Sequence, residues 1–384
     1  MQPVPTDHLT VVGALDEERT PAGVVARRFP SWTRHQILDP RLDLMVSMPS
    51  GVRIVFETDA DAIEIDVHVT HLQVGELPAA PAVFDAVVDG AVGPSAVTDV
   101  GTTITYDPFT LAVGVEPGPS TTVRFEGLRP ADGDEGPRRT EIWLPQRCVV
   151  AVGEVRVSSD AATARTGPTG RRTWVHYGSS ISHCLEADRP TGIWPAVAAR
   201  IGGVDLRNLA VAGQCHLDQM VARTIRDLDV GLISVKAGIN VINADSMRER
   251  TFVPAVHGFL DTIRDGHPTT PILLVSPIVC PVAEDHPGPT VPLRTGRVGV
   301  VERPEQMGEG ALTLRRIRAL LAQVVDDRRS FGDPNLHLLD GLRLFGPDDA
   351  DGLPDGLHPD ATGYHLIGER FAAHAFAPGG PFAS

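Results

Sequence analysis

Residues 173–182 read Thr-Trp-Val-His-Tyr-Gly-Ser-Ser-Ile-Ser, an apolar run of strand length that passes directly into a serine-rich turn. The residues after the turn can begin a helix. A serine in such a turn has an exposed hydroxyl, and the helix N-terminus behind it stabilises negative charge. On its own the motif is more typical of an ordinary serine N-cap, because short motifs often occur by chance.

The sequence after residue 173 alternates between strand-sized apolar runs and helical stretches. The runs lie at residues 174–177, 206–211, 232–235, 272–275 and 336–339. The clearest helix spans residues 312–325, where apolar side chains recur at helical spacing: Leu314, Ile317, Leu320, Leu321 and Val324. This alternation predicts a parallel sheet with helices on both faces. In such a sheet the chemistry lies just beyond the carboxyl ends of the strands.

Three further segments place polar groups at that same predicted edge. Residues 212–214, Ala-Gly-Gln, follow the second apolar run, and residues 238–240, Gly-Ile-Asn, follow the third. Residues 355–359, Asp-Gly-Leu-His-Pro, precede a helix that we expect to start near Ala361. An Asp and a His three residues apart on one turn can meet, so that the carboxylate orients the imidazole.

Together the four segments supply a complete set of groups for acyl transfer. Ser180 is the candidate nucleophile, His358 the candidate base, and Asp355 the acid that orients the base. Three groups are candidate donors to an oxyanion: the backbone N–H groups of Ser180 and Gly213, and the side-chain amide of Asn240. Each segment alone is a weak or moderate signal, but their coincidence at one sheet edge predicts a serine-dependent catalytic site.

In this order the four segments resemble the four sequence blocks of the SGNH (GDSL) hydrolase superfamily, which contribute Ser, Gly, Asn and His. The resemblance extends from residue 173 to about residue 376 and implies a three-layer α/β fold with a parallel sheet. It implies the same roles for Ser180, Gly213, Asn240 and His358, with Asp355 in the family's acid position.

Two positions depart from the family's usual pattern. The first block usually reads Gly-Asp-Ser, but here Ser179 stands in the middle position, so two adjacent serines compete as the nucleophile. The register with Ile181, which follows them, selects Ser180. An acidic residue often follows the Asn of the third block. Val241 occupies that position here, so we expect another group to support Asn240.

The first 160 residues have a different pattern, in which apolar and polar residues alternate along short runs. Ile63, Ile65, Val67 and Val69, for example, alternate with polar side chains. Other runs lie at residues 52–56, 82–88, 102–106, 121–125 and 149–157, with turn signals at residues 89–90, 117–119 and Asp132-Gly133-Asp134. This pattern, with no convincing helix, predicts an all-β sandwich over residues 1–160. Residues 161–172 are the predicted linker, and residues 173–384 the predicted catalytic domain.

A β-sandwich in front of an SGNH domain resembles two groups of proteins. One is the carbohydrate esterases that carry an accessory jelly roll, and the other is a two-domain acyltransferase type from aromatic polyketide tailoring. The length and layout are most similar to the second group, the salicylyl acyltransferase type of tetracycline-type pathways. This resemblance implies a jelly-roll-like sandwich and the transfer of an aromatic acyl group from a thioester, such as acyl-CoA, to a hydroxyl of a polyketide acceptor. The alternative is an esterase that hydrolyses small esters or O-acetylated carbohydrates.

A binding module is the alternative from a different class of function: the sandwich would hold a carbohydrate, and the second half would have lost catalysis. The intact set of five candidate residues argues against this alternative.

The expected chemistry requires no metal or prosthetic group, with acyl-CoA as a possible co-substrate. The connection over residues 280–310 is long enough to cover the site as a lid. The sequence leaves the donor, the acceptor and the oligomeric state open.

Three histidines near the predicted site, His176, His183 and His216, raise the question of a metal site. No HExxH-type spacing supports zinc, so we expect these side chains to support the site or to contact substrate. Cys184 is expected to fill the core on the helix after Ser180, and Cys215 to pack near the oxyanion hole. We assign no role to Lys236, the only lysine in the chain.

Composition excludes several other classes of function. The 384 residues carry 34 basic and 49 acidic side chains, a formal net charge of −15, so nucleic acid and anionic membranes are disfavoured as partners. No apolar stretch approaches the ~20 residues of a spanning helix. The N-terminus lacks a basic start followed by an apolar core, and the four cysteines form no CxxC pair. These features predict a cytoplasmic enzyme whose partners are a small acyl donor and a hydroxyl acceptor.

Overall fold

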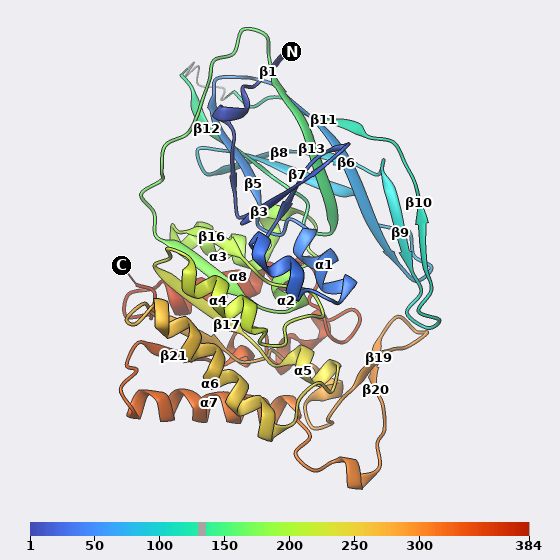
Figure 1. The fold of residues 1–384 in the computed structure, drawn as a ribbon, viewed down its shortest axis with the longest axis vertical. Coiled ribbons are helices and arrows are strands. Elements are labelled where there is room, and N and C mark those ends of the chain that lie inside the picture. Colours follow the sequence, from blue (N-terminus) through green and yellow to red (C-terminus); the bar gives the residue numbers. More distant parts are fainter. Residues whose placement is uncertain (130–135, 384) are drawn as a thin grey trace. The chain divides into compact units, whose positions relative to one another are not determined.

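The computed structural model describes residues 1–129 and 136–383, so the turn predicted at Asp132-Gly133-Asp134 lies outside the described residues. The chain divides into two compact units (Figure 1). The first unit comprises Met1–Arg171 and the short segment Asp188–Thr191, and the second comprises Arg172–Ala187 and Gly192–Ser384.

The first unit is built from two β-sheets. One sheet has eight strands in the order β10-β9-β6-β13-β4-β3, with β1 paired to β13 and β11 paired to β6. Its strands are β1 (Gln2–Pro3), β3 (Asp16–Thr20), β4 (Gly23–Arg27), β6 (Ile63–Val74), β9 (Thr102–Tyr106), β10 (Val113–Glu116), β11 (Thr121–Phe125) and β13 (Cys148–Val157). The other has six strands in the order β14-β5-β12-β7-β8, with β2 paired to β5. Its strands are β2 (Thr10–Val12), β5 (Arg53–Thr58), β7 (Ala82–Val88), β8 (Ala91–Thr98), β12 (Arg138–Trp143) and β14 (Thr163–Ala164).

The two sheets share one apolar core, which confirms the predicted all-β sandwich. Along β6, Ile65 and Val67 are buried while Asp66 between them is partly exposed, as a period of two requires. Phe84 of β7 and Ile142 of β12, from the other sheet, belong to the same buried cluster. The strand pairs are antiparallel except for β6 and β9, which run parallel.

Two features of the first unit differ from the sequence-based expectation. A helix, α1 (Pro40–Ser47), is present where no helix was predicted. The side chain of Asp39 caps it by accepting from the N–H of Arg41, and Pro40 occupies the first turn, where a missing N–H costs nothing. In addition, part of the predicted linker forms β14, which pairs with β5.

The second unit has a five-stranded sheet in the order β16-β15-β17-β18-β21, and every pair in it is parallel. The strands are β15 (Thr173–Tyr177), β16 (Asp205–Asn208), β17 (Leu232–Lys236), β18 (Ile272–Val275) and β21 (Leu336–Leu339). The helices are α2 (Ser180–His183), α3 (Trp194–Gly202), α4 (Gln219–Asp227), α5 (Ile239–Asn243), α6 (Glu249–Gly266), α7 (Leu314–Ser330) and α8 (Ala361–Ala375). A small hairpin, β19 (Thr290–Pro292) with β20 (Val298–Val300), lies in the connection after β18.

Alternation along β15 explains why helices cover both faces of this sheet. Trp174 points to one face and stacks on Phe371 of α8, with ring centroids 5.0 Å apart. Tyr177 points to the other face and stacks on Phe259 of α6 at 5.5 Å. Helix α3 packs beside α8, whereas α4 and α7 pack beside α6 (Figure 1). The predicted three-layer α/β arrangement is therefore confirmed, and no described helix is long and apolar enough to cross a membrane.

Candidate active site

Ser180 lies immediately beyond the carboxyl end of β15, as the first residue of α2. The side chain is largely buried, with 7% of the residue exposed. Helix α2 is a single turn because Cys184 adopts a left-handed conformation, with φ 62°, and caps its end. The prediction that Cys184 lies on the helix after Ser180 is therefore wrong in detail: it terminates that helix, although it is fully buried as expected.

The structure brings Ser180, His358 and Asp355 into one hydrogen-bonded chain. Nε2 of His358 lies 2.8 Å from Oγ of Ser180, and Nδ1 lies 2.7 Å from Oδ2 of Asp355. The other carboxylate oxygen of Asp355 accepts from the backbone N–H groups of Leu357 and His358. Ser179 is the N-cap of α2, and its hydroxyl makes no hydrogen bond within the described residues. Of the two candidate serines, Ser180 is thus the one that faces the imidazole.

Local sequence places His358 for this contact. Asp360 is the N-cap of α8, where its side chain accepts from the N–H of Gly363 at 2.7 Å. The helix therefore starts just after the histidine and fixes the end of the loop that carries it. At the other end of the loop, Gly356 has a φ of +86°, a conformation that favours glycine.

Two carboxylates set the charge of the imidazole. Burial lowers the pKa of His358, but the negative charges of Glu186 and Asp355 more than offset this effect and raise the pKa to about 9. Burial would raise the pKa of Asp355, yet the hydrogen bond from His358 and the backbone N–H groups hold it below its ordinary value. The pair thus favours a charged imidazolium beside an ionised aspartate.

Glu186 and Tyr364 belong to this site but carried no signal in the sequence. Oε1 of Glu186 lies 3.7 Å from Nδ1 of His358, and the hydroxyl of Tyr364 donates to Oε2 of Glu186 at 2.7 Å. Glu186 follows α2 and Tyr364 lies in α8. No spacing rule connects these positions, and only the fold brings them together.

The proposed oxyanion donors follow the neighbouring strands. Gly213, beyond β16, has a φ of +69°, which glycine adopts without strain. Asn240 lies in α5 beyond β17 and is 1% exposed. Its Oδ1 accepts from the backbone N–H of Cys215 at 3.0 Å, which leaves its NH₂ group as the donating end. The support that Val241 cannot supply therefore comes from the backbone of Cys215.

The histidines considered as metal ligands are held by other contacts. His176 is fully buried, with Nδ1 2.7 Å from Oγ of Ser234, and burial together with the charge of Lys236 lowers its pKa to about 3. His183 is buried in α2, and Nδ1 of His216 lies 2.9 Å from Oγ of Ser246. Over residues 1–129 and 136–383, no group of three or more His, Cys, Asp or Glu side chains could hold a metal ion.

Cys215 and Lys236 are both buried. The thiol of Cys215 faces the backbone oxygen of Lys236 at 3.6 Å, and burial raises the pKa of this thiol to about 12. Burial also lowers the pKa of Lys236 to about 8. Cys215 thus holds Asn240 through its backbone, while its side chain is an inert neutral thiol.

The connection over residues 280–310 reaches the triad through its hairpin. The N–H of Val298, in β20, donates to the backbone oxygen of Asp355 at 2.8 Å. The side chain of Arg297 also approaches the loop that carries His358. If Gly356 had a Cβ atom, Nη2 of Arg297 would lie 3.4 Å from it. The hairpin is therefore attached to the segment that carries Asp355 and His358.

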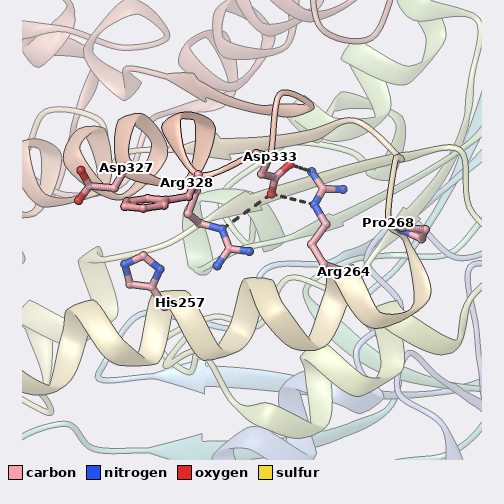
Figure 2. A pocket seen from close by; sticks show the side chains of 8 residues that line it. His257, Arg264, Pro268, Asp327, Arg328 and Asp333 are labelled. Carbon is pink, nitrogen blue, oxygen red and sulfur yellow. Dashed lines mark hydrogen bonds and ion pairs between the residues drawn. The ribbon is translucent and has the colours of Figure 1, made fainter.

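A separate hollow of about 750 Å³ lies between α6 and α7, and none of the triad residues lines it (Figure 2). Arg264 pairs with Asp333 at 2.8 Å, and Nε of Arg328 lies 3.8 Å from the same carboxylate. His257 also lines this hollow. Since its two guanidinium groups share one carboxylate, and Ser180, Asp355 and His358 are not among its lining residues, this hollow is not the site of the chemistry described above.

Comparison with known proteins agrees with this geometry. Residues 176–366 match the model of the GDSL-like Lipase/Acylhydrolase family. No curated protein matches the sequence.

Several solved structures are similar to this chain. The salicylyl-acyltransferase SsfX3 from a tetracycline biosynthetic pathway is 27% identical with a TM-score of 0.76, and the match covers 94% of this chain and 92% of that one. A family two carbohydrate esterase from Clostridium thermocellum is 15% identical with a TM-score of 0.56, covering 84% of this chain and 91% of that one. An acetyl xylan esterase from Butyrivibrio proteoclasticus is 11% identical with a TM-score of 0.51, covering 96% and 95%.

Proposed function

Because the carboxy-terminal half of this chain belongs to the GDSL-like lipase and acylhydrolase family, we propose that it transfers acyl groups through a covalent ester on Ser180. The observation that carries the proposal is the contact chain from Asp355 through His358 to Ser180, with steps of 2.7 and 2.8 Å. A nucleophile, its base and the group that orients the base are thereby within hydrogen-bond reach of one another.

In the first half-reaction, Oγ of Ser180 attacks the carbonyl carbon of an acyl thioester while Nε2 of His358 takes the hydroxyl proton. The negative charge that develops on the carbonyl oxygen is stabilised by the N–H groups of Ser180 and Gly213 and by the amide of Asn240. The tetrahedral intermediate collapses, the C–S bond breaks, and the leaving thiolate receives the proton from His358. An acyl ester of Ser180 and a free thiol remain.

In the second half-reaction, an alcohol replaces the thiol. The acceptor hydroxyl gives its proton to His358 and attacks the ester carbonyl. When the new intermediate collapses, Oγ of Ser180 leaves and regains a proton from His358. The products are the acylated acceptor and the free enzyme. Water in place of the alcohol would give hydrolysis by the same steps.

The finer proposal is that the acyl group is aromatic, that the donor is a thioester such as acyl-CoA, and that the acceptor is a hydroxyl of a tetracycline-type polyketide. Support comes from the similarity to the salicylyl-acyltransferase, which extends over 94% of this chain and therefore includes the β-sandwich. The carbohydrate esterases share the fold at much lower identity. An esterase acting on small esters or O-acetylated carbohydrates remains the alternative.

The proposal includes the setting of the reaction. An acyl-CoA donor would place the enzyme in the cytoplasm, with small molecules as its partners. The net charge of −15 disfavours nucleic acid and anionic membranes as binding surfaces. Binding of the acceptor beside the acyl-serine, under a lid formed by residues 280–310, would favour the alcohol over water, because an oriented neighbour can reach effective molarities of about 10⁵–10⁸ M.

The test follows thiol release from an aromatic acyl-CoA with and without a polycyclic phenol or alcohol. Transfer predicts slow release without acceptor, faster release with it, and an ester product whose mass is the sum of the corresponding carboxylic acid and the acceptor less water. Fast release that no alcohol changes would identify an esterase instead. The Ser180→Ala variant is the control for uncatalysed release.

A further inference from the structure

A second carboxylate faces the triad histidine from outside the Asp355 loop. Oε1 of Glu186 lies 3.7 Å from Nδ1 of His358, the same nitrogen that contacts Asp355 at 2.7 Å. Glu186 follows the short helix that begins with Ser180, so it reaches the imidazole from the nucleophile's side of the sequence. None of the sequence blocks that define the site includes this residue.

Tyr364 determines where this carboxylate points. The tyrosine is fully buried in α8, and its hydroxyl donates to Oε2 of Glu186 at 2.7 Å. Burial and the charge of Glu186 raise the pKa of Tyr364 well above its ordinary value, so the phenol stays protonated and remains a donor. The side chain of Glu186 is 37% exposed, and without this bond it would be free to turn toward solvent. Because Tyr364 holds Oε2 of Glu186, the other carboxylate oxygen, Oε1, faces His358.

We propose that Glu186, oriented by Tyr364, is a positioning residue of the acyl transfer: it helps Asp355 to keep the proton of His358 on Nδ1 and strengthens the imidazole as a base. The inference rests on the proposed function, because it assigns a role toward the histidine that activates Ser180. Glu186 acts through the histidine, and within the described residues the partners of its carboxylate are His358 and Tyr364 and not Ser180.

The charged and titratable groups around His358 are few and come from several elements. The two carboxylates are Asp355, on its own loop, and Glu186, after α2. The neutral groups are the hydroxyls of Ser180 and Tyr364 and the buried thiols of Cys184 and Cys280. The thiol of Cys280 donates to the backbone oxygen of Gly356 at 3.4 Å.

A cation approaches the loop that carries His358. It is Arg297 of the hairpin, whose side chain lies near Gly356. Negative charge therefore predominates next to the imidazole.

The sign of the effect follows from this arrangement. Burial lowers the pKa of His358. The charge of Glu186 is the largest single contribution in the opposite direction, and Asp355 adds a hydrogen bond and its own charge, with a resulting pKa of about 9. Removing the charge of Glu186 must therefore lower the pKa of His358. A less basic imidazole is neutral over a wider pH range but takes the proton of Ser180 less readily. The variant should lose rate on the alkaline plateau and gain relative rate at low pH.

The experiment compares pH profiles of kcat/KM on an activated aryl ester for the full chain and for Glu186→Gln. We expect the acid limb of Glu186→Gln to move to lower pH by about one unit, as for an opposite charge removed from contact range. Tyr364→Phe should shift the limb in the same direction by a smaller amount. Glu369→Gln, which removes an exposed carboxylate from α8, is the matched control and should leave the profile unchanged.

A second readout does not depend on turnover. NMR titration of the His358 imidazole in a Ser180→Ala background should show a lower midpoint when Glu186→Gln is added. An unchanged midpoint and an unchanged acid limb would overturn the inference while leaving the acyl-serine proposal intact. If Glu186→Gln does not fold, Tyr364→Phe decides by the same two measurements. Failure of the unmodified protein to form any acyl-enzyme would instead refute the proposed function.

Discussion

The backbone N–H of Cys215 donates a hydrogen bond to Oδ1 of Asn240, with the two atoms 3.0 Å apart. This bond joins the loop after β16, which carries Gly213, to helix α5, which carries the amide. The bond fixes the orientation of the amide of Asn240, a residue that is 1% exposed, and so determines which way its NH₂ group points. The two proposed oxyanion donors Gly213 and Asn240 are thereby held together through the hydrogen bond from the backbone of Cys215.

Removing this amide should affect the reaction more than the fold. We expect Asn240→Ala to lower kcat by roughly 10²–10³ on an activated ester, because one preorganised oxyanion donor is lost. The freed N–H of Cys215 adds a modest loss of stability, about 1–3 kcal/mol for a buried donor without a partner. Asn243→Ala, one turn along in α5, is the control and should retain nearly full activity. A rate for Asn240→Ala equal to that of the control would remove Asn240 from the mechanism.

The pKa of His358 predicts an alkaline reaction. The imidazole must be neutral to accept the proton of Ser180, and its pKa is about 9. Below that value kcat/KM should therefore rise about tenfold per pH unit, and above it the rate should level. Stopped-flow assays of ester cleavage across pH 6 to 10 measure this directly. A plateau already reached at neutral pH would mean that the two carboxylates do not control the base.

A buried carboxylate in the first unit is expected to matter for stability. Asp85 is fully buried in β7 and accepts from Arg189, from the hydroxyl and N–H of Thr191, and from Ser95. Arg189 and Thr191 lie in the segment Asp188–Thr191, which belongs to this unit although the flanking chain belongs to the second. We expect Asp85→Asn to lower the free energy of unfolding by about 1.5–3 kcal/mol, the range for hydrogen bonds to a charged group.

The pH dependence of this contribution has a definite sign. Burial alone would raise the pKa of Asp85, but its hydrogen bonds hold the pKa below the ordinary value. The stabilisation is therefore complete above the pKa of Asp85 in the unfolded chain, which is about 4. It is lost as the pH falls through the lower pKa of Asp85 in the folded protein. Urea unfolding at several pH values measures it, with Ser95→Ala as the milder comparison. Equal stability of Asp85→Asn and the unmodified protein at neutral pH would contradict this account.

The sequence predicts the strands whose apolar residues are buried on both faces of the sheet, but it does not show where those strands end. The five strands of the second unit were predictable because each carries an apolar run covered on both faces. The second run was predicted to reach residue 211, yet β16 ends at Asn208. Leu209 and Val211 are fully buried in the loop that follows, and their N–H groups still donate to the backbone oxygens of His176 and Gly178. Composition cannot distinguish such a segment from a strand. Helix α1 was missed because it is short and has no long amphipathic pattern.

The same distinction applies to the site. Ser180, Asp355 and His358 could be predicted because each lies in a short motif at a strand end or helix start. The partner of Asn240 could not, since a backbone N–H has no sequence signature. Glu186 and Tyr364 are 178 positions apart in the chain, and only the packing of α8 brings them together. Long-range side-chain contacts of this kind depend on tertiary structure that local patterns do not encode.

The central claim is that Ser180 carries the acyl group, and mass-spectrometric mapping of the acylated residue tests it most directly. The protein is incubated with an aromatic acyl thioester, quenched in acid and digested, and the acylated residue is located by fragmentation. Our account predicts one acyl group on Ser180, none on the Ser180→Ala variant, and continued acylation of Ser179→Ala. An adduct on Ser179, or a Ser180→Ala variant that still becomes acylated, would contradict it.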